Sequence, residues 1–365
     1  MKVIWVSRKK SLGAGLIFLA CSTSLVAQAP RCTRVVLTEP EPLWISSAVY
    51  VNSLKEIAVV DPLRNNLVLI GQNGTSHLYD PKRLISDKEK MTPGILNSTG
   101  PDSFSLSMID QRLYRLDAEL NKVGLEDLAK AATGAQGSII STYDSVVSGG
   151  EFFSFGAVKA ADSQIHFGFF QAPIKDPTRV TFLKDFNDVD YYLLGHHYLA
   201  DLAGEKYAVM MSPNKPVIVH FPHDGPAEVM DVIPENYKRA PKFKTEQNGP
   251  NSEVALFKEI EGLTIPVGLY GNQDGNLYLL TREPRAGKTR WRLFRIDPKR
   301  RLPTREAELP TTANHLTVLN TPDNWYIFEK GPVQPLGKQQ IGSMLTIPSS
   351  AIRSLTIPGL CQTMK

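Results

Sequence analysis

Apolar and polar side chains alternate with a period of two in short runs along most of this chain. In the clearest run, Phe104, Leu106 and Met108 alternate with serines, and a short polar stretch separates them from a second apolar run at 113–116. Successive side chains of a strand point to opposite faces of a sheet. The pattern therefore predicts two strands joined as a hairpin.

The start of the chain contains a fuller version of the same unit. Strands are predicted at 44–51, 56–61 and 66–71, and an Asn73-Gly74 turn leads to a fourth. Weaker units follow at 138–170, 191–221, 265–296 and 316–328. With the unit around the first hairpin these make six, at a spacing of roughly 45 to 60 residues that radial repeats with long outer loops allow.

Two of these units resemble the blades of six-bladed β-propellers. The residues that carry the resemblance are Ala48-Val49-Tyr50-Val51, Glu56-Ile57-Ala58-Val59-Val60-Asp61, Asn66-Leu67-Val68-Leu69-Ile70-Gly71, Gly268-Leu269-Tyr270, Asp274-Gly275-Asn276-Leu277-Tyr278 and Arg295-Ile296-Asp297. The other units match by spacing alone. The resemblance implies an all-β propeller, with six four-stranded blades in one domain over residues 30–365, and it identifies a fold, not an activity.

Two segments fit the repeat less well. Residues 116–132 carry leucines among Glu, Asp and Lys, which favours a short amphipathic helix between blades. Residues 234–262 are basic in part and are interpreted as a long insertion or a solvated surface loop. Seven shorter blades would also fit the length, and 234–262 would be a linker in a two-domain arrangement.

The first 29 residues have the pattern of an export signal. Lys2 and the basic run 8–10 precede a short apolar run at 12–20, and Ala27-Gln28-Ala29 resembles a signal peptidase site. The apolar run is too short to span a bilayer, and no later stretch is long enough. We expect a periplasmic or extracellular protein without a transmembrane segment; lipid attachment through Cys21 is a less favoured alternative.

Removal of residues 1–29 changes the charge balance and the cysteine count. Four of the 41 basic residues are lost and none of the 37 acidic ones, so the apparent net charge of +4 disappears. This balance does not favour nucleic-acid binding. Cys32 and Cys361 then remain at opposite ends of the mature chain. In an oxidising compartment we expect them to form a disulfide, and a circular architecture would bring the two ends together.

Histidines provide weak candidates for a metal site. His196 and His197 are adjacent, and His220 and His223 flank a Phe-Pro pair before Asp224. Imidazoles and a carboxylate suit zinc or iron. However, neighbouring residues on a strand, and residues three apart, point to opposite faces, so only turns would gather this set. Surface or hydrogen-bonding histidines are the favoured interpretation.

No catalytic set emerges from the motifs. The Gly-x-Ser-x-Gly pattern of serine hydrolases is absent. Six-bladed propellers that act as lactonases hold an ion in the central channel through Glu, Asn and Asp side chains, but the sequence does not identify such a set. The aspartates at predicted strand ends and turns are interpreted as caps for backbone N–H groups.

We therefore favour a non-catalytic binding or scaffold protein over an enzyme. We expect a monomer without a cofactor, whose top face or channel binds a protein, glycan or small molecule. Aromatic residues near predicted loops are either ligand contacts or core residues: Tyr191, Tyr192, Tyr198, Trp325 and Tyr326. The alternative is a metal-dependent hydrolase or lactonase with a divalent ion at the channel.

Overall fold

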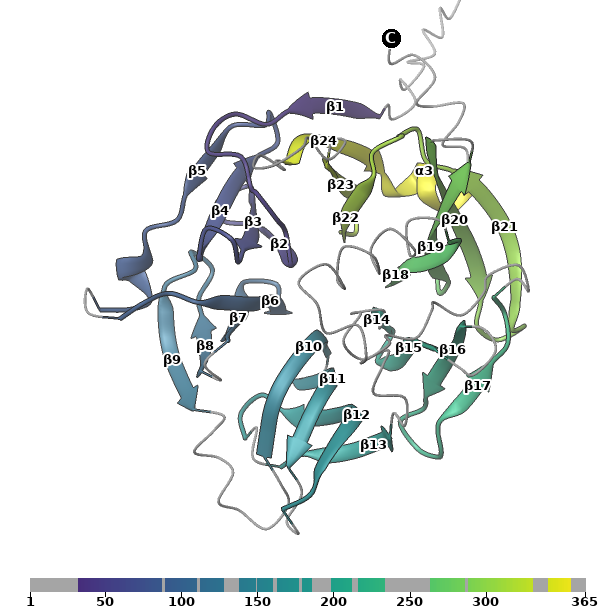
Figure 1. The fold of residues 1–365 in the computed structure, drawn as a ribbon, viewed down its shortest axis with the longest axis horizontal. Helices are drawn as coiled ribbons and strands as arrows, with labels where there is room; N and C mark the ends of the chain where they lie inside the picture. The colour runs from purple at the N-terminus through teal and green to yellow at the C-terminus, as the bar shows by residue number, and fades with distance from the viewer. Residues whose placement is uncertain are drawn as a thin grey trace, which may run out of the picture.

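The computed structural model describes residues 32–86, 89–109, 112–127, 138–148, 150–159, 163–176, 179–185, 198–211, 216–233, 263–285, 288–330 and 341–355. The described strands form six four-stranded antiparallel sheets, arranged as blades around a central channel (Figure 1). Each blade runs from an innermost strand to an outermost strand. The structure confirms the predicted all-β, six-bladed propeller.

The first three blades follow the chain directly. Blade 1 contains β2 (Ser47–Val51), β3 (Glu56–Asp61), β4 (Asn66–Gly71) and β5 (Ser76–Leu78), and the 3-10 turn η1 (Pro81–Arg83) follows it. Blade 2 contains β6 (Pro93–Gly100), β7 (Ser103–Met108), β8 (Arg112–Leu116) and β9 (Lys122–Asp127). Blade 3 contains β10 (Ser138–Ser148), β11 (Glu151–Lys159), β12 (Ile165–Pro173) and β13 (Thr181–Asp185).

The second half of the ring repeats the arrangement and adds one exchange. Blade 4 contains β14 (Tyr198–Leu202), β15 (Glu205–Met211), β16 (Pro216–Phe221) and β17 (Glu228–Met230). Blade 5 contains β18 (Ile265–Gly271), β19 (Leu277–Arg285), β20 (Lys288–Asp297) and β21 (Leu302–Glu308). Blade 6 contains β22 (His315–Asn320), β23 (Asn324–Lys330), β24 (Ile341–Pro348) and, outermost, β1 (Thr33–Val36).

The core lies between neighbouring blades, which explains the long apolar runs of the middle strands. In β3, Ile57 and Val59 pack in a cluster with blade 6, whereas the alternating Ala58 and Val60 pack with blade 2. All four side chains are fully buried. A sheet covered on both faces requires apolar residues at every position, so the propeller arrangement determines this pattern.

The ring closes where β1 pairs with β24. Thr33 lies opposite Thr346, and the Leu37 N–H donates to the Gly342 carbonyl at 3.1 Å. Beside this junction Gly74 has a positive φ of 86°, and a Cβ there would lie 2.4 Å from the Val36 carbonyl oxygen. Glycine is therefore required where blade 1 meets β1.

The helix predicted over 116–132 is wrong in its described part. Leu116 ends β8, a turn follows, and 122–127 form the outer strand β9. Asp117 closes the turn by accepting the backbone N–H groups of Glu119 and Asn121. Leu120 is fully buried between blades 1 and 2, so its apolar character reflects packing between sheets, not one face of a helix.

Several predictions lie outside the described residues. The export signal at 1–29, including Cys21, and the segment 234–262 belong to this group. Among the described residues there is no helix with the length and apolar character needed to cross a membrane. The helix α3 (Ser349–Ser354), which packs beside β23 and β24, has six residues.

Candidate functional site

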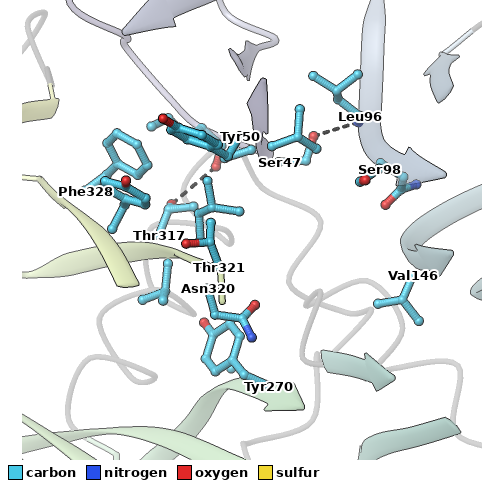
Figure 2. Close-up of a pocket in the computed structure, with 18 of the residues that line it drawn as sticks. Ser47, Tyr50, Leu96, Ser98, Val146, Tyr270, Thr317, Asn320, Thr321 and Phe328 are labelled. Atoms are coloured by element: carbon cyan, nitrogen blue, oxygen red, sulfur yellow. Dashed lines mark hydrogen bonds between the residues drawn. The ribbon is translucent and has the colours of Figure 1, made fainter. Parts of the chain in front are cut away.

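The central channel is a large concave feature of the described residues. The innermost strands of all six blades line a cavity of about 1010 Å³, and Figure 2 shows part of its lining. Some hydrogen bonds between neighbouring blades lie near the first residues of the innermost strands, as between Ser47 and Leu96. Others lie near the last residues of these strands, as between Asn320 and Gly271. We call the end of the channel where these strands begin the start end, and the opposite end the finish end.

Hydroxyl and amide groups of the lining connect neighbouring blades. The Ser47 hydroxyl oxygen accepts the Leu96 N–H at 2.8 Å, which joins β2 to β6 (Figure 2). The Asn97 side chain donates to the Ser145 hydroxyl at 2.8 Å and joins β6 to β10. These hydrogen bonds join blades 1, 2 and 3 along their innermost strands.

Similar hydrogen bonds join blade 6 to its two neighbours. The Thr317 hydroxyl donates to the Ile45 carbonyl at 3.4 Å, and the Asn320 amide donates to the Gly271 carbonyl at 2.7 Å. Gly271 also approaches blade 4, because a Cβ there would lie 1.8 Å from the Asp201 carbonyl oxygen. The finish end is thus a tight seam of three blades.

Tyrosines and amides are concentrated at the finish end. The rings of Tyr50 and Tyr326 stack with centroids 6.0 Å apart and an interplanar angle of 4°. Gln72 donates to the Tyr50 hydroxyl at 3.1 Å. Tyr270 and Asn320 lie side by side there in Figure 2. The cluster combines aromatic faces with neutral donors and acceptors.

Charged groups in the described lining balance one another. They are the carboxylates of Asp201 and Asp323 and the cations of Arg282 and Lys330, with His315 as the one histidine. Asp201 and Asp323 lie toward the finish end, whereas His315 begins β22 at the start end. This separation does not suit the channel ion of the alternative hydrolase or lactonase hypothesis, because the donors to such an ion must converge.

Lys330 is the most unusual charged group of the channel. The residue is only 4% exposed, and its ammonium lies over the ring of Trp44, 4.2 Å from the centroid. Burial lowers the pKa of the Lys330 amine below its ordinary value. Lys330 forms no ion pair with a carboxylate of the described residues.

The predicted histidine set is only partly described. His220, on the third strand of blade 4, bonds the Glu205 carboxylate at 2.8 Å and stacks on Tyr207. His223 and Asp224 are exposed in the turn after β16. His196 and His197 lie outside the described residues, and no three His, Cys, Asp or Glu side chains of the described part form a metal cluster. A metal role for this set stays a prediction.

The cysteine pair is also only half described. Cys32 is 6% exposed directly before β1, in the apolar cluster of blades 5 and 6. Cys361 lies outside the described residues, so the predicted disulfide stays a prediction.

The aromatic candidates divide between the core and the channel. Trp325 is 1% exposed and packs edge-on against Tyr270 and Tyr278, so it belongs to the core. Tyr198 and Tyr326 line the channel, Tyr326 from a largely buried position. The other two candidates, Tyr191 and Tyr192, lie outside the described residues.

Sequence reasoning missed Trp44 and Lys330. The available signal was a charged pair, Glu329-Lys330, at the end of the apolar run 325–328, in a strand with neighbours on both sides. A charge at such a position is buried and therefore needs a partner or a function.

Comparison with known proteins supports the fold alone. No family model matches the chain, and no curated protein matches it by sequence. A gluconolactonase structure from Xanthomonas campestris has 12% identity and a TM-score of 0.51, covering 88% of this chain and 92% of its own. A virginiamycin B lyase from Staphylococcus aureus has 8% identity and a TM-score of 0.44, covering 87% and 98%. At such identities the likeness extends to the propeller and not to an activity.

Proposed function

We propose that this chain is an exported binding protein whose propeller channel holds a hydroxyl-rich small molecule, such as a segment of a glycan. The observation that carries the proposal is the cavity of about 1010 Å³, whose described lining consists mainly of apolar, hydroxyl, amide and aromatic residues. Export is proposed from the basic start and apolar run within residues 1–29.

The chemistry of the finish end suits hydroxyl groups. An amide side chain offers both donors and acceptors, as a sugar hydroxyl does, so Gln72 and Asn320 match such a ligand. The face of Tyr50 presents apolar area with a polar tip. Apolar lining with a few convergent polar groups is typical of small-molecule sites.

We do not extend the proposal to a metal-dependent hydrolase. The described lining of the channel contains two carboxylates, those of Asp201 and Asp323, and both lie toward the finish end. Its one described histidine, His315, lies at the start end. A hydrolytic ion would need donors that converge on one point.

Calorimetric titration of the mature protein with a panel of neutral and acidic oligosaccharides tests the proposal. The informative variant is Tyr50→Ala, and its matched control is Leu78→Ala, an exposed residue on the outer strand of the same blade. We expect Tyr50→Ala to weaken binding at least about tenfold, because stacking on an aromatic face is lost.

Leu78→Ala should bind as the unaltered protein does. The proposed channel site would be overturned if no member of the panel binds. It would also be overturned if a ligand binds the unaltered protein and Tyr50→Ala equally tightly. Thermal melts of both variants verify that each remains folded.

A further inference from the structure

Lys330 and Trp44 form a compact pair between blades 6 and 1. Lys330 is the last residue of β23 and lies opposite His315, the first residue of β22. Trp44 precedes β2 and is 41% exposed, and its ring is tilted against that of His315 at 6.4 Å. Lys330 and Trp44 both line the cavity, so the pair faces the start end of the channel.

The charge of Lys330 has no protein counterpart in the described chain. A buried ammonium is unfavourable unless a carboxylate or comparable acceptor compensates it. The Trp44 face provides a cation–π attraction, but it supplies no negative charge to neutralise the ammonium. Burial is accordingly the cause that lowers the pKa of Lys330.

The neighbouring titratable groups do not supply the missing charge. Glu329 points to the other side of the strand, where it pairs with Arg34. Glu41 has a buried carboxylate oxygen without a hydrogen-bond partner, but it forms no ion pair with Lys330. His315, the residue opposite Lys330 on the neighbouring strand, is a base and offers no negative charge.

We propose that Lys330 and Trp44 bind the carboxylate of the channel ligand, with the ammonium as its ion-pair partner and the indole against the ligand's body. The inference rests on the proposed binding function and adds one acidic group to the ligand, which makes a sugar acid the expected class. The amine of Lys330 has three donors, and a carboxylate accepts two or more of them in short, charge-assisted bonds.

Glucuronate and glucose are the probes, because they differ in one acidic group. We expect the unaltered protein to bind glucuronate more tightly than glucose. Lys330→Met should weaken glucuronate binding by about 10- to 100-fold, because a charge-assisted bond is lost, and should leave glucose unchanged. Lys206→Met is the control: Lys206 is also buried, but it pairs with Glu151 at 3.4 Å and does not line the cavity.

A second readout separates this inference from the proposed function. The pKa of the Lys330 amine is measured by competitive acetylation with mass spectrometry, in chloride, acetate and glucuronate at equal ionic strength. A bound carboxylate favours the charged amine and should raise that pKa, even if the sugar body of the probe is wrong.

Each outcome is decisive. The inference is overturned if the protein binds glycans without preferring glucuronate and the pKa of Lys330 is the same in acetate and glucuronate as in chloride. The proposed function then remains intact. Failure of all sugars to bind refutes the proposed function, and the acetate measurement then decides the carboxylate site alone. Equal loss of glucuronate binding in Lys330→Met and Lys206→Met also contradicts the inference.

Discussion

Arg34 on the outermost strand of blade 6 forms a two-pronged ion pair with Glu329 on β23, with Nε–Oε2 at 2.8 Å and Nη2–Oε1 at 2.9 Å. The Glu329 side chain is only 7% exposed and also accepts the Ser343 hydroxyl at 2.7 Å. The two partners come from opposite ends of the chain. Side chains as well as backbone pairing therefore close the ring.

Loss of this ion pair should destabilise the closed ring. We expect Arg34→Met to lower the free energy of unfolding by about 2–3 kcal/mol, because it leaves a buried carboxylate without its cation, while the partial exposure of Arg34 moderates the loss. Equilibrium unfolding in urea measures the change.

The control is Arg300→Met, which removes an exposed partner of Asp297. Arg300 is 77% exposed and its Nε lies 3.5 Å from the carboxylate. Its removal should cost less than about 0.5 kcal/mol. Equal effects of the two substitutions would show that the closing pair contributes no more than a surface pair.

Gly271 is the point at which blades 4, 5 and 6 meet. A Cβ would lie 1.8 Å from the Asp201 carbonyl oxygen, and the Gly271 carbonyl accepts the Asn320 amide. We expect Gly271→Ala to cost about 2 kcal/mol or more, because backbone of two blades must separate.

Gly342→Ala is the matched control for this position. Gly342 also lies on a strand, but a Cβ there meets nothing within 4 Å, and its φ lies outside the left-handed region. It should change stability by less than about 0.5 kcal/mol. A Gly271→Ala protein with unaltered thermal melting would refute the tight seam.

The propeller could be predicted from the sequence because its strands share one physical requirement. A sheet that is covered on both faces needs apolar residues at successive positions. Strands such as 56–61 and 66–71 are covered on both faces, and the structure confirms both at their predicted bounds. The helix predicted over 116–132 was wrong because Leu120 is buried between two sheets. Periodicity in a short stretch does not distinguish these two causes of burial.

The candidate site was less predictable than the fold. Trp44 and Lys330 are far apart in the chain and meet only because the ring closes. Tyr50 and Tyr326 stack for the same reason. Pairs that depend on closure have no local signature in the sequence, so the predicted histidine set rested on residue type and closeness in the chain.

Asp61, at the end of β3, should matter more than Asp297, the aspartate at the end of β20 in blade 5. Asp61 is fully buried and accepts the Leu43 N–H at 2.7 Å, in addition to two N–H groups of its own turn. We expect Asp61→Ala to cost about 2–4 kcal/mol, since buried backbone donors lose their acceptor.

Asp297 provides the comparison because it accepts two turn N–H groups from a more exposed position. Asp297→Ala should cost about 1 kcal/mol. Chemical denaturation of both variants at neutral pH makes the comparison. A larger loss for Asp297→Ala would contradict the structural role assigned to Asp61.

Alkaline pH should destabilise the fold through its buried tyrosines. Burial raises the pKa of Tyr79 and of Tyr207 to about 12, and burial beside the Asp274 carboxylate also raises the pKa of Tyr278. Unfolded tyrosines lose their protons near pH 10. Between these pKa values the unfolded chain releases protons that the folded chain retains, so stability is complete below about pH 10 and falls as pH rises toward 12.

Tyr79→Phe separates this pH effect from an effect on packing. The Tyr79 hydroxyl donates to the Leu120 carbonyl at 2.6 Å, across blades 1 and 2. Its removal should cost about 1–3 kcal/mol at neutral pH, because the buried carbonyl loses its donor. The variant should then lose less further stability above pH 10 than the unaltered protein, because one buried phenol no longer ionises. Urea unfolding across this pH range tests both effects, and parallel pH profiles for the two proteins would refute the role of Tyr79.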